Sequence, residues 1–262
     1  EKESSGGFQF EAVDFDPCFI KNIDIKNFFE KWGLDTCSHM KRYTFDEFFS
    51  KHQLDIFLKD FFASAKVQQT LQVAAGRSTW VGVGPIKSVE VEELNTKVAH
   101  MGFFDKIKEL EPAVVRDNDQ LSIVKCFDDM CNGVLVSDEL RKMILIEDSE
   151  HYPEFDDEER KELILHTLRR LVVGGGQCQY EDDMMPYLNV TKALYKDLVS
   201  VTKNASTKMI EVTSFAYQII SVSADFELFP HNALHDHSFC YVVIEPLQRH
   251  VTIWYGAHIS AF

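Results

Sequence analysis

The chain has 262 residues, of which 45% are hydrophobic and 26% charged, and its 27 Lys and Arg against 42 Asp and Glu give a net charge of −15. The hydrophobic share provides for a sizeable core, so the composition excludes a disordered, collagen-like or low-complexity chain. The acidic balance argues against nucleic acid and anionic membranes as partners, because affinity for a phosphate backbone comes largely from Lys and Arg. The longest apolar runs are strand-sized, which argues against a membrane-spanning helix.

The six cysteines are spread through the chain. A chain of this length does not need disulfides to hold its core together. We therefore expect reduced thiols and a cytosolic setting.

Two stretches in the first third have the spacing of amphipathic helices. Ile25, Phe28, Phe29 and Trp32 fall at i, i+3, i+4 and i+7, and Gly33 is placed to end that helix. The second stretch repeats the pattern with Leu54, Phe57, Leu58 and Phe61. This phenylalanine-rich stripe could dock a partner, but apolar residues at helical spacing usually face their own core, and we predict packing.

Strand and helix signals alternate through the middle of the chain. Residues 79–85 and 88–91 predict two strands joined by a Gly/Pro turn, and residues 122–126 predict another strand. Ser137 is placed to cap a helix that carries three apolar residues. These are Leu140, Met143 and Ile144. The region therefore mixes helices and strands.

The next helix has the clearest boundaries. Asp156 is placed as its N-cap with Glu159 three residues later, which is the spacing of a capping box. Acidic residues crowd the first turn, where the helix dipole favours negative charge. The apolar face is formed by Ile164, Thr167, Leu168, Leu171 and Val172. Gly174 is placed to end the helix.

From Lys192 onward the apolar period changes from about 3.6 towards 2 residues, which predicts strands. Four β-branched and aromatic runs lie at residues 194–201, 209–222, 239–245 and 250–255. We predict that they form an antiparallel sheet, with a bulge near Thr213. In the last strand, one face is formed by Val251, Ile253 and Tyr255.

These elements predict an α+β fold, with a mixed N-terminal lobe, central amphipathic helices and a C-terminal antiparallel sheet. The sequence contains no internal repeat and no long linker. We therefore expect one domain over residues 1–262, with a soft internal boundary near residues 110–120, around Pro112.

The strongest candidate for metal binding is a group of imidazole and thiol side chains near the C-terminus, since these groups are the usual zinc ligands. Its members are His231, His235, His237 and Cys240. Structural zinc sites usually bring paired ligands from two places, whereas here one local group has only scattered partners. A polar loop before a strand is the alternative that we favour, and we expect no cofactor.

Other catalytic patterns are weak. Glycines 174–176 follow a predicted helix, whereas a phosphate-binding loop precedes one, and no Lys-Ser/Thr pair comes after them. The sequence has no Gly-x-Ser-x-Gly motif for a nucleophile. Carboxylates are plentiful, but none is set apart by an apolar environment that would tune its pKa. We therefore expect a protein that is not an enzyme.

Charge is concentrated in residues 147–162, which contain nine acids and two bases for a net of −7. Such a segment could attract a basic partner surface. Alternatively, it could serve only to keep the chain soluble and to place negative charge at the N-terminus of a helix. Residues 181–183 extend it if the fold brings the two loops together. The candidate partner-binding residues are Glu147, Asp148, Glu150, Glu154, Asp156, Asp157, Glu158, Glu159, Glu181, Asp182 and Asp183.

Several strings in the central region are long and specific. They are IVKC at 123–126, SDELR at 137–141, EDSE at 147–150, CQYED at 178–182, PYL at 186–188 and YKDLVSV at 195–201. With these strings the chain closely resembles the cilia- and flagella-associated protein 300 family. The resemblance covers about residues 122–203 and continues more weakly to residue 250. The strings indicate family membership and carry no catalytic or metal residue across.

The resemblance implies a non-catalytic adaptor or assembly factor for outer and inner axonemal dynein arms, needed for motile cilia and flagella. The expected partners are dynein arm assembly factors, axonemal dynein subunits and the intraflagellar transport machinery, with neither nucleic acid nor membrane. The expected location is the cytoplasm and the motile cilium, including the axoneme. Two alternatives stay open: a small-molecule or metal-dependent enzyme using His235, His237 and Cys240, and a structural component fixed in the axoneme.

Overall fold

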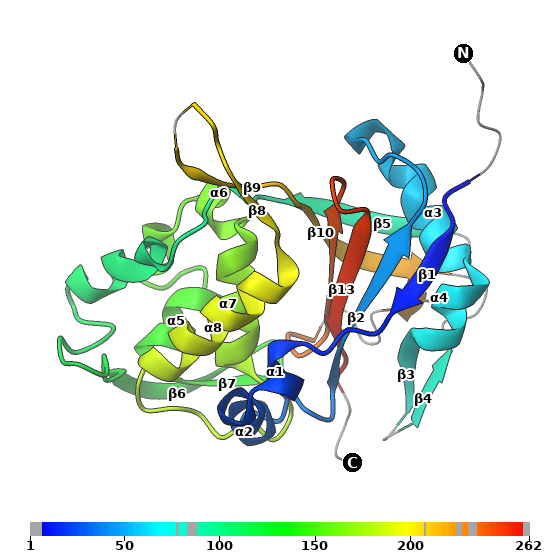
Figure 1. The fold of residues 1–262 in the computed structure, drawn as a ribbon. Helices are drawn as coiled ribbons and strands as arrows, with labels where there is room; N and C mark the ends of the chain where they lie inside the picture. Colours follow the sequence, from blue (N-terminus) through cyan, green and yellow to red (C-terminus); the bar gives the residue numbers. More distant parts are fainter. Residues whose placement is uncertain are drawn as a thin grey trace.

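A seven-stranded antiparallel sheet runs through the middle of the molecule (Figure 1). The computed structural model describes residues 7–76, 79–82, 88–206, 208–223, 227–229 and 235–258. The sheet consists of β1 (Phe10–Val13), β2 (Ser38–Phe45), β5 (Ser88–Leu94), β10 (Phe215–Ser223), β11 (Glu227–Phe229), β12 (Phe239–Glu245) and β13 (His250–Gly256). Its order is β1-β2-β13-β12-β10-β11, and β5 also pairs with β10. Strands from both ends of the chain therefore share one sheet.

The two central strands of this sheet are buried on both faces. On β12, Phe239, Tyr241 and Val243 join one core cluster, whereas the alternate residues Cys240 and Val242 join the other. Every residue of β12 is buried, as is every residue of β13 after His250. Because helices cover both faces, these strands are mostly apolar on both sides and lack the polar alternation of a strand with one solvated face.

One face of the sheet is covered by α3 (Leu54–Ala63) and α4 (Ala65–Thr70), seen on the right of Figure 1. Their core is built from aromatic rings in edge-to-face contact. The ring of Phe57 lies 5.1 Å from that of Phe10 on β1, and Phe61 lies 5.2 Å from Tyr43 on β2. The phenylalanine stripe of this helix therefore packs into the protein's own core, as predicted.

The other face carries a thicker helical layer, seen on the left of Figure 1. Its α-helices are α1 (Cys18–Lys21), α2 (Ile23–Lys31), α5 (Glu139–Leu145), α6 (Asp157–Arg160), α7 (Leu163–Val173) and α8 (Met185–Leu198).

Smaller elements complete the fold. The 3₁₀ helices are η1 (Lys51–Gln53), η2 (Met101–Glu109) and η3 (Tyr152–Glu154). Three separate hairpins are β3 (Gln72–Gly76) with β4 (Thr79–Gly82), β6 (Lys125–Cys131) with β7 (Val134–Asp138), and β8 (Val201–Lys203) with β9 (Ile210–Val212). The predicted α+β class is confirmed, while the single-domain organisation stays a prediction.

The helix boundaries agree with the sequence signals except at two caps. Gly33 and Gly174 have φ values of 65° and 67°, so each ends its helix in the backbone region that glycine favours. The capping box of Asp156 and Glu159 is present, but it starts the short α6, and α7 begins separately after Glu162. Asp138, and not Ser137, caps α5, because its side chain accepts a hydrogen bond from the Arg141 amide at 2.9 Å.

The predicted strand at residues 194–201 is wrong, because residues up to Leu198 belong to α8. The buried residues of α8 follow helical spacing through Tyr187, Val190, Leu194 and Leu198. The prediction joined the last turn of the helix, with Leu194, Tyr195 and Leu198, to Val199 and Val201 beyond its end, and the combined run had the composition of a strand. Only the short β8 follows.

Three other strand predictions need adjustment. The strand expected at 122–126 begins at Lys125, and Ser122 and Ile123 make only isolated bridges. The strands near residues 79 and 88 exist, but β4 pairs with β3 and β5 pairs with β10. The turn between them lies outside the described residues. The expected bulge near Thr213 is a break between β9 and β10.

His166 on α7 gives the fold a measurable sensitivity to acid. Its Nδ1 lies 3.2 Å from the Tyr241 hydroxyl, and burial, with Arg170 and Arg169 nearby, lowers the His166 pKa from 6.5 to about 3. The unfolded chain therefore binds a proton between pH 6.5 and 3 that the folded chain does not, so stability falls as pH falls through this window. From pH 7 to 5, this histidine alone should lower the free energy of unfolding by about 2 kcal/mol.

Urea unfolding at pH 7 and pH 5 measures this effect. The variant His166→Gln should lose about 2 kcal/mol less than the parent between the two pH values, because glutamine does not titrate. The exposed His52 is the control, and His52→Gln should follow the parent. An unchanged pH dependence in His166→Gln would show that this histidine does not resist protonation in the folded state.

Candidate functional site

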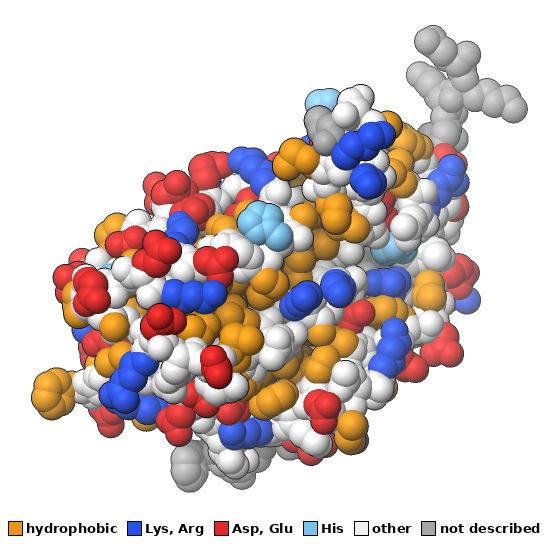
Figure 2. Space-filling view, turned by 60° about the vertical axis from the view of Figure 1, so that its left-hand side comes forward, with side chains coloured by type: hydrophobic (Ala, Val, Ile, Leu, Met, Phe, Trp, Pro, Cys, Tyr) orange, Lys and Arg blue, Asp and Glu red, His pale blue; other side chains and the backbone are white. Residues whose placement is uncertain are grey.

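The acidic segment, residues 147–162, follows α5 and contains η3 and α6 before α7 begins. Five of its carboxylates are exposed and have no ion pair or side-chain hydrogen bond among the described contacts. We call them the open acids, and they are Glu147, Asp148, Glu150, Glu154 and Asp157. The face shown in Figure 2 carries acidic side chains in groups, with Lys and Arg side chains between them. The open acids therefore supply exposed negative charge, although Arg160 lies close enough to Glu147 and Asp157 to interact with them electrostatically.

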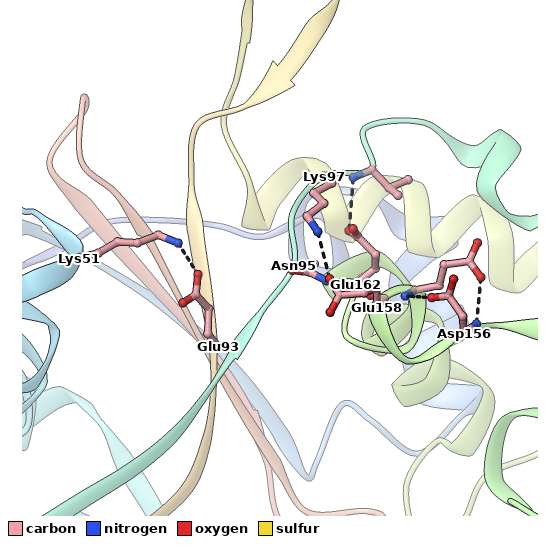
Figure 3. Close-up of polar contacts among 9 residues, drawn as sticks. Lys51, Glu93, Asn95, Lys97, Asp156, Glu158 and Glu162 are labelled. Atoms are coloured by element: carbon pink, nitrogen blue, oxygen red, sulfur yellow. Dashed lines mark hydrogen bonds and ion pairs between the residues drawn. The ribbon is translucent and has the colours of Figure 1, made fainter.

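The remaining acids of the segment are engaged within the protein. Lys97 Nζ lies 3.1 Å from Glu158 Oε2, and this contact, with Asn95, lowers the pKa of Glu158. Glu159 accepts from Lys106 at 2.6 Å and completes the capping box with Asp156. Figure 3 shows Asn95 and Lys97 pointing at Glu158 from the chain that leaves β5. These contacts fix the start of α6 to the sheet.

Glu162 ends the segment as a buried carboxylate. Its Oε2 accepts a hydrogen bond from the Val98 amide at 3.3 Å, and burial raises its pKa. The Leu163 amide donates to the carbonyl of Asn95 at 2.9 Å. Glu162 therefore separates α6 from α7 and is not part of the exposed charge.

In the second acidic group, residues 181–183, each carboxylate contacts a neighbouring side chain. Glu181 is only 8% exposed; its Oε1 accepts from Trp32 Nε1 at 2.9 Å and lies 2.8 Å from Lys31 Nζ. Asp182 is exposed but lies 2.7 Å from Lys125 Nζ, which lowers the Asp182 pKa. Asp183 accepts from the Ser122 hydroxyl at 2.8 Å.

The two acidic groups occupy different parts of the helical layer. In Figure 1, α6 lies at the top of the layer and α2, whose C-terminal end contacts Glu181, lies at the bottom. No hydrogen bond or ion pair joins the two groups within the described parts of the chain. An interaction surface would therefore use the open acids without residues 181–183.

Glu181 belongs to a buried polar network that the sequence did not reveal. Arg141 pairs with Asp138, both with fully buried side chains, and donates to the Tyr187 hydroxyl at 2.8 Å. The same hydroxyl accepts from the Glu181 amide at 3.0 Å. The Trp32 ring stacks on Tyr187 at 4.8 Å. This network joins the ends of α2 and β7 to α5 and α8, which gives it a structural role.

A surface hollow of about 640 Å³ lies between β6 and α5. Lys125 and Lys142 line it together with Asp128, Asp129 and Glu139, so its charge is mixed. The aromatic ring at its edge, Phe127, is 98% exposed. The mixed charge favours no particular class of ligand.

The structure rearranges the predicted histidine and cysteine group. His235 and His237 lie together, and they are joined by His258, which the sequence reading missed. Cys240 lies in the core cluster on the opposite face of the sheet, so it is separated from them, and burial raises its pKa well above the usual range. His231 lies outside the described residues.

The three imidazoles are in direct contact. The rings of His235 and His258 stack at 3.7 Å with an interplanar angle of 9°, and His235 and His237 lie 4.6 Å apart. Burial lowers the pKa of His237 to about 4, with a further contribution from His235. Burial and His258 also lower the pKa of His235. His235 and His237 are therefore neutral near pH 7.

The glycines at 174–176 follow α7 and do not start a helix, so they do not form a phosphate-binding loop. The fold and these surfaces define an α+β protein with an exposed acidic segment. None of the helices in the described ranges is long and apolar enough to cross a bilayer. The family model for cilia- and flagella-associated protein 300 matches residues 7–256. The chain therefore belongs to the cilia- and flagella-associated protein 300 family, which confirms the resemblance seen in the sequence.

Two relatives show how far the similarity extends. The cilia- and flagella-associated protein 300 of Chlamydomonas reinhardtii is 34% identical over 244 residues, covering 92% of this chain and 93% of the relative. That of Paramecium tetraurelia is 32% identical over 234 residues, covering 88% and 87%. No solved structure matches the chain. The family match includes the N-terminal third, where the sequence strings gave no signal.

Proposed function

We propose that this cilia- and flagella-associated protein is a non-catalytic adaptor or assembly factor for outer and inner axonemal dynein arms. The observation that carries the proposal is the family match over residues 7–256. The resemblance to this family implies a role in the assembly of dynein arms. Its partners would be dynein arm assembly factors, axonemal dynein subunits and the intraflagellar transport machinery. It would act in the cytoplasm and in the motile cilium, including the axoneme.

The open acids supply the contact in this proposal. They lie within an eleven-residue stretch, 147–157, and are exposed. Their charge would attract a partner with a Lys- and Arg-rich surface and would speed association at low salt. Asp156, Glu158 and Glu159 would hold the segment in place through the capping box and the contacts with Lys97 and Lys106.

Charge reversal tests this contact. The variant Glu147→Lys/Asp148→Lys/Glu150→Lys changes three exposed side chains of one loop, and we expect it to recover far less partner protein from cytosol than the parent. The loss should be largest at low salt, because screening weakens the parent's attraction as salt rises. Quantitative mass spectrometry of the co-purified proteins measures both effects.

A matched variant controls for net charge. Asp14→Lys/Asp16→Lys/Glu47→Lys reverses three exposed acids elsewhere on the chain and changes the net charge equally. It should bind like the parent. Equal recovery by the two variants at low salt would refute the assignment of the contact to the open acids, while the family membership would stand.

A further inference from the structure

We propose that His235, His237 and His258 bind one divalent transition-metal ion, of which Zn²⁺ is the representative. Each residue offers a ring nitrogen, and the three nitrogens all lie within 4.8 Å of one another. Nitrogens that share a tetrahedral zinc ion lie about 3.3 Å apart, given Zn–N distances of about 2.0–2.1 Å. Binding one ion therefore requires the rings to turn, His235 and His258 out of their stacked arrangement in particular.

Strand pairing explains why these residues meet. In the β12–β13 pair, Phe239 lies opposite Gly256, and the register runs antiparallel. Continuing that register by two residues places His237 opposite His258. His235 reaches the other two rings through the turn before β12, in which the Ser238 amide donates to the His235 carbonyl at 2.8 Å. Cys240, on β12 itself, faces the core cluster on the other side of the sheet. The cluster therefore follows from the hairpin itself.

The surroundings hold the histidines in place for a ligand. A Cβ built on Gly133, in the turn between β6 and β7, would lie 2.3 Å from Nε2 of His235. Nδ1 of the same ring accepts a hydrogen bond from the His237 backbone amide at 3.2 Å, so binding an ion through His235 replaces one of these two contacts. Arg169 pairs with the Asp236 side chain, and Arg170 donates to the Asp236 carbonyl at 2.6 Å, which fixes the residue between two ligands.

One nitrogen of the cluster lacks a partner. His237 is only 8% exposed, and its Nδ1 is buried without a hydrogen bond. Buried polar atoms in folded proteins nearly always have a partner, so an unpaired ring nitrogen beside two other imidazoles indicates a missing ligand. Three imidazoles suit zinc and other late first-row ions and leave a fourth position for water.

The bound ion would join the segment before β12 to the segment after β13. Such a link acts on stability, because an ion that binds only the folded chain shifts the unfolding equilibrium. No chemical step is required of it. The site lies at one end of the central hairpin and is independent of the open acids.

Zinc binding to the full chain tests the proposal. Untagged protein, stripped with a chelator and dialysed, is titrated with Zn²⁺ in competition with a metal-binding dye, and Co²⁺ absorption reports the coordination geometry. We expect one zinc per chain, a tetrahedral cobalt spectrum and a higher melting temperature with zinc. His237→Gln/His258→Gln should weaken binding by more than about 100-fold, since even residues behind the ligands contribute about 10–100-fold.

The exposed His52 supplies the control, and His52→Gln should bind zinc like the parent. Circular dichroism in chelator checks that each variant is folded, and the single variant His258→Gln replaces the double one if that fails to fold. A folded parent that takes up no zinc would overturn the proposal. Zinc uptake that is equal in the parent and in a folded variant of the cluster would overturn it too.

Discussion

Replacing Asp138 by alanine is expected to lower the free energy of unfolding by about 3–5 kcal/mol, because it leaves the Arg141 guanidinium buried without its counterion. Both side chains are fully buried, so water cannot solvate the charge of Arg141. Its guanidinium carbon lies 3.4 Å from the ring centroid of Tyr180. Asp138 also caps α5, so the same change removes a backbone hydrogen bond. Urea unfolding at pH 7 measures the loss.

A neighbouring pair provides the comparison. Glu139 and Lys142 have the same i,i+3 spacing on the same helix, but their side chains are 23% and 39% exposed. Glu139→Ala should therefore cost less than about 1 kcal/mol. The double variant Asp138→Leu/Arg141→Met should cost less than Asp138→Ala, because no charge stays buried alone. Equal losses in Asp138→Ala and Glu139→Ala would contradict the structural role of the pair.

The second large effect is expected at Trp32, where alanine should cost about 3–5 kcal/mol. This side chain is fully buried, stacks on Phe28 at 5.1 Å and on Tyr187 at 4.8 Å, and donates to Glu181. The loss combines a cavity with a buried carboxylate that has lost a donor. Thermal and urea unfolding with circular dichroism measure it.

Two further variants separate these contributions. Trp32→Phe keeps most of the ring packing but removes the bond to Glu181, so it should cost about 1–3 kcal/mol. Phe127, which is 98% exposed, is the control, and Phe127→Ala should stay within about 0.5 kcal/mol of the parent. A Trp32→Ala variant as stable as Phe127→Ala would show that α2 does not pack as described.

The sequence predicts best where one periodicity or cap decides the structure. The helix around Phe29, the capping box at Asp156 and the strands β12 and β13 are where the pattern placed them. The sequence pattern failed at the end of α8, where helical residues run directly into Val199 and Val201. It also could not show that β1, β2 and β5 join the C-terminal strands, because such pairing depends on contacts far apart in sequence.

The candidate site was predictable in charge but not in geometry. Residues 147–162 are acidic by count, yet only the structure separates the open acids from Glu158 and Glu159, which neighbouring lysines engage. Glu181 has the same residue type but is buried against Trp32. Burial of this kind depends on tertiary packing, which local composition does not encode.

The histidine cluster shows a signal that the sequence did contain. His258 lies beyond the last predicted strand, and pairing the strands at 239–245 and 250–255 through a short turn brings it opposite His237. Cys240 is close to the histidines in sequence and was therefore grouped with them, but its side chain points to the other face of the sheet from those of Phe239 and Tyr241. Extending the register of this strand pair adds His258 to the predicted group, and the alternation of side chains along β12 excludes Cys240.

Affinity purification of the unmodified protein from the cytosol of cells building motile cilia tests the proposed function most directly. Mass spectrometry compares the captured proteins with those from a matched cell type that builds none. We expect enrichment of axonemal dynein chains and their assembly factors in the ciliating cells. Capture of neither, with the protein found only in axonemes and retained there after salt extraction, would contradict an assembly role and favour a structural one.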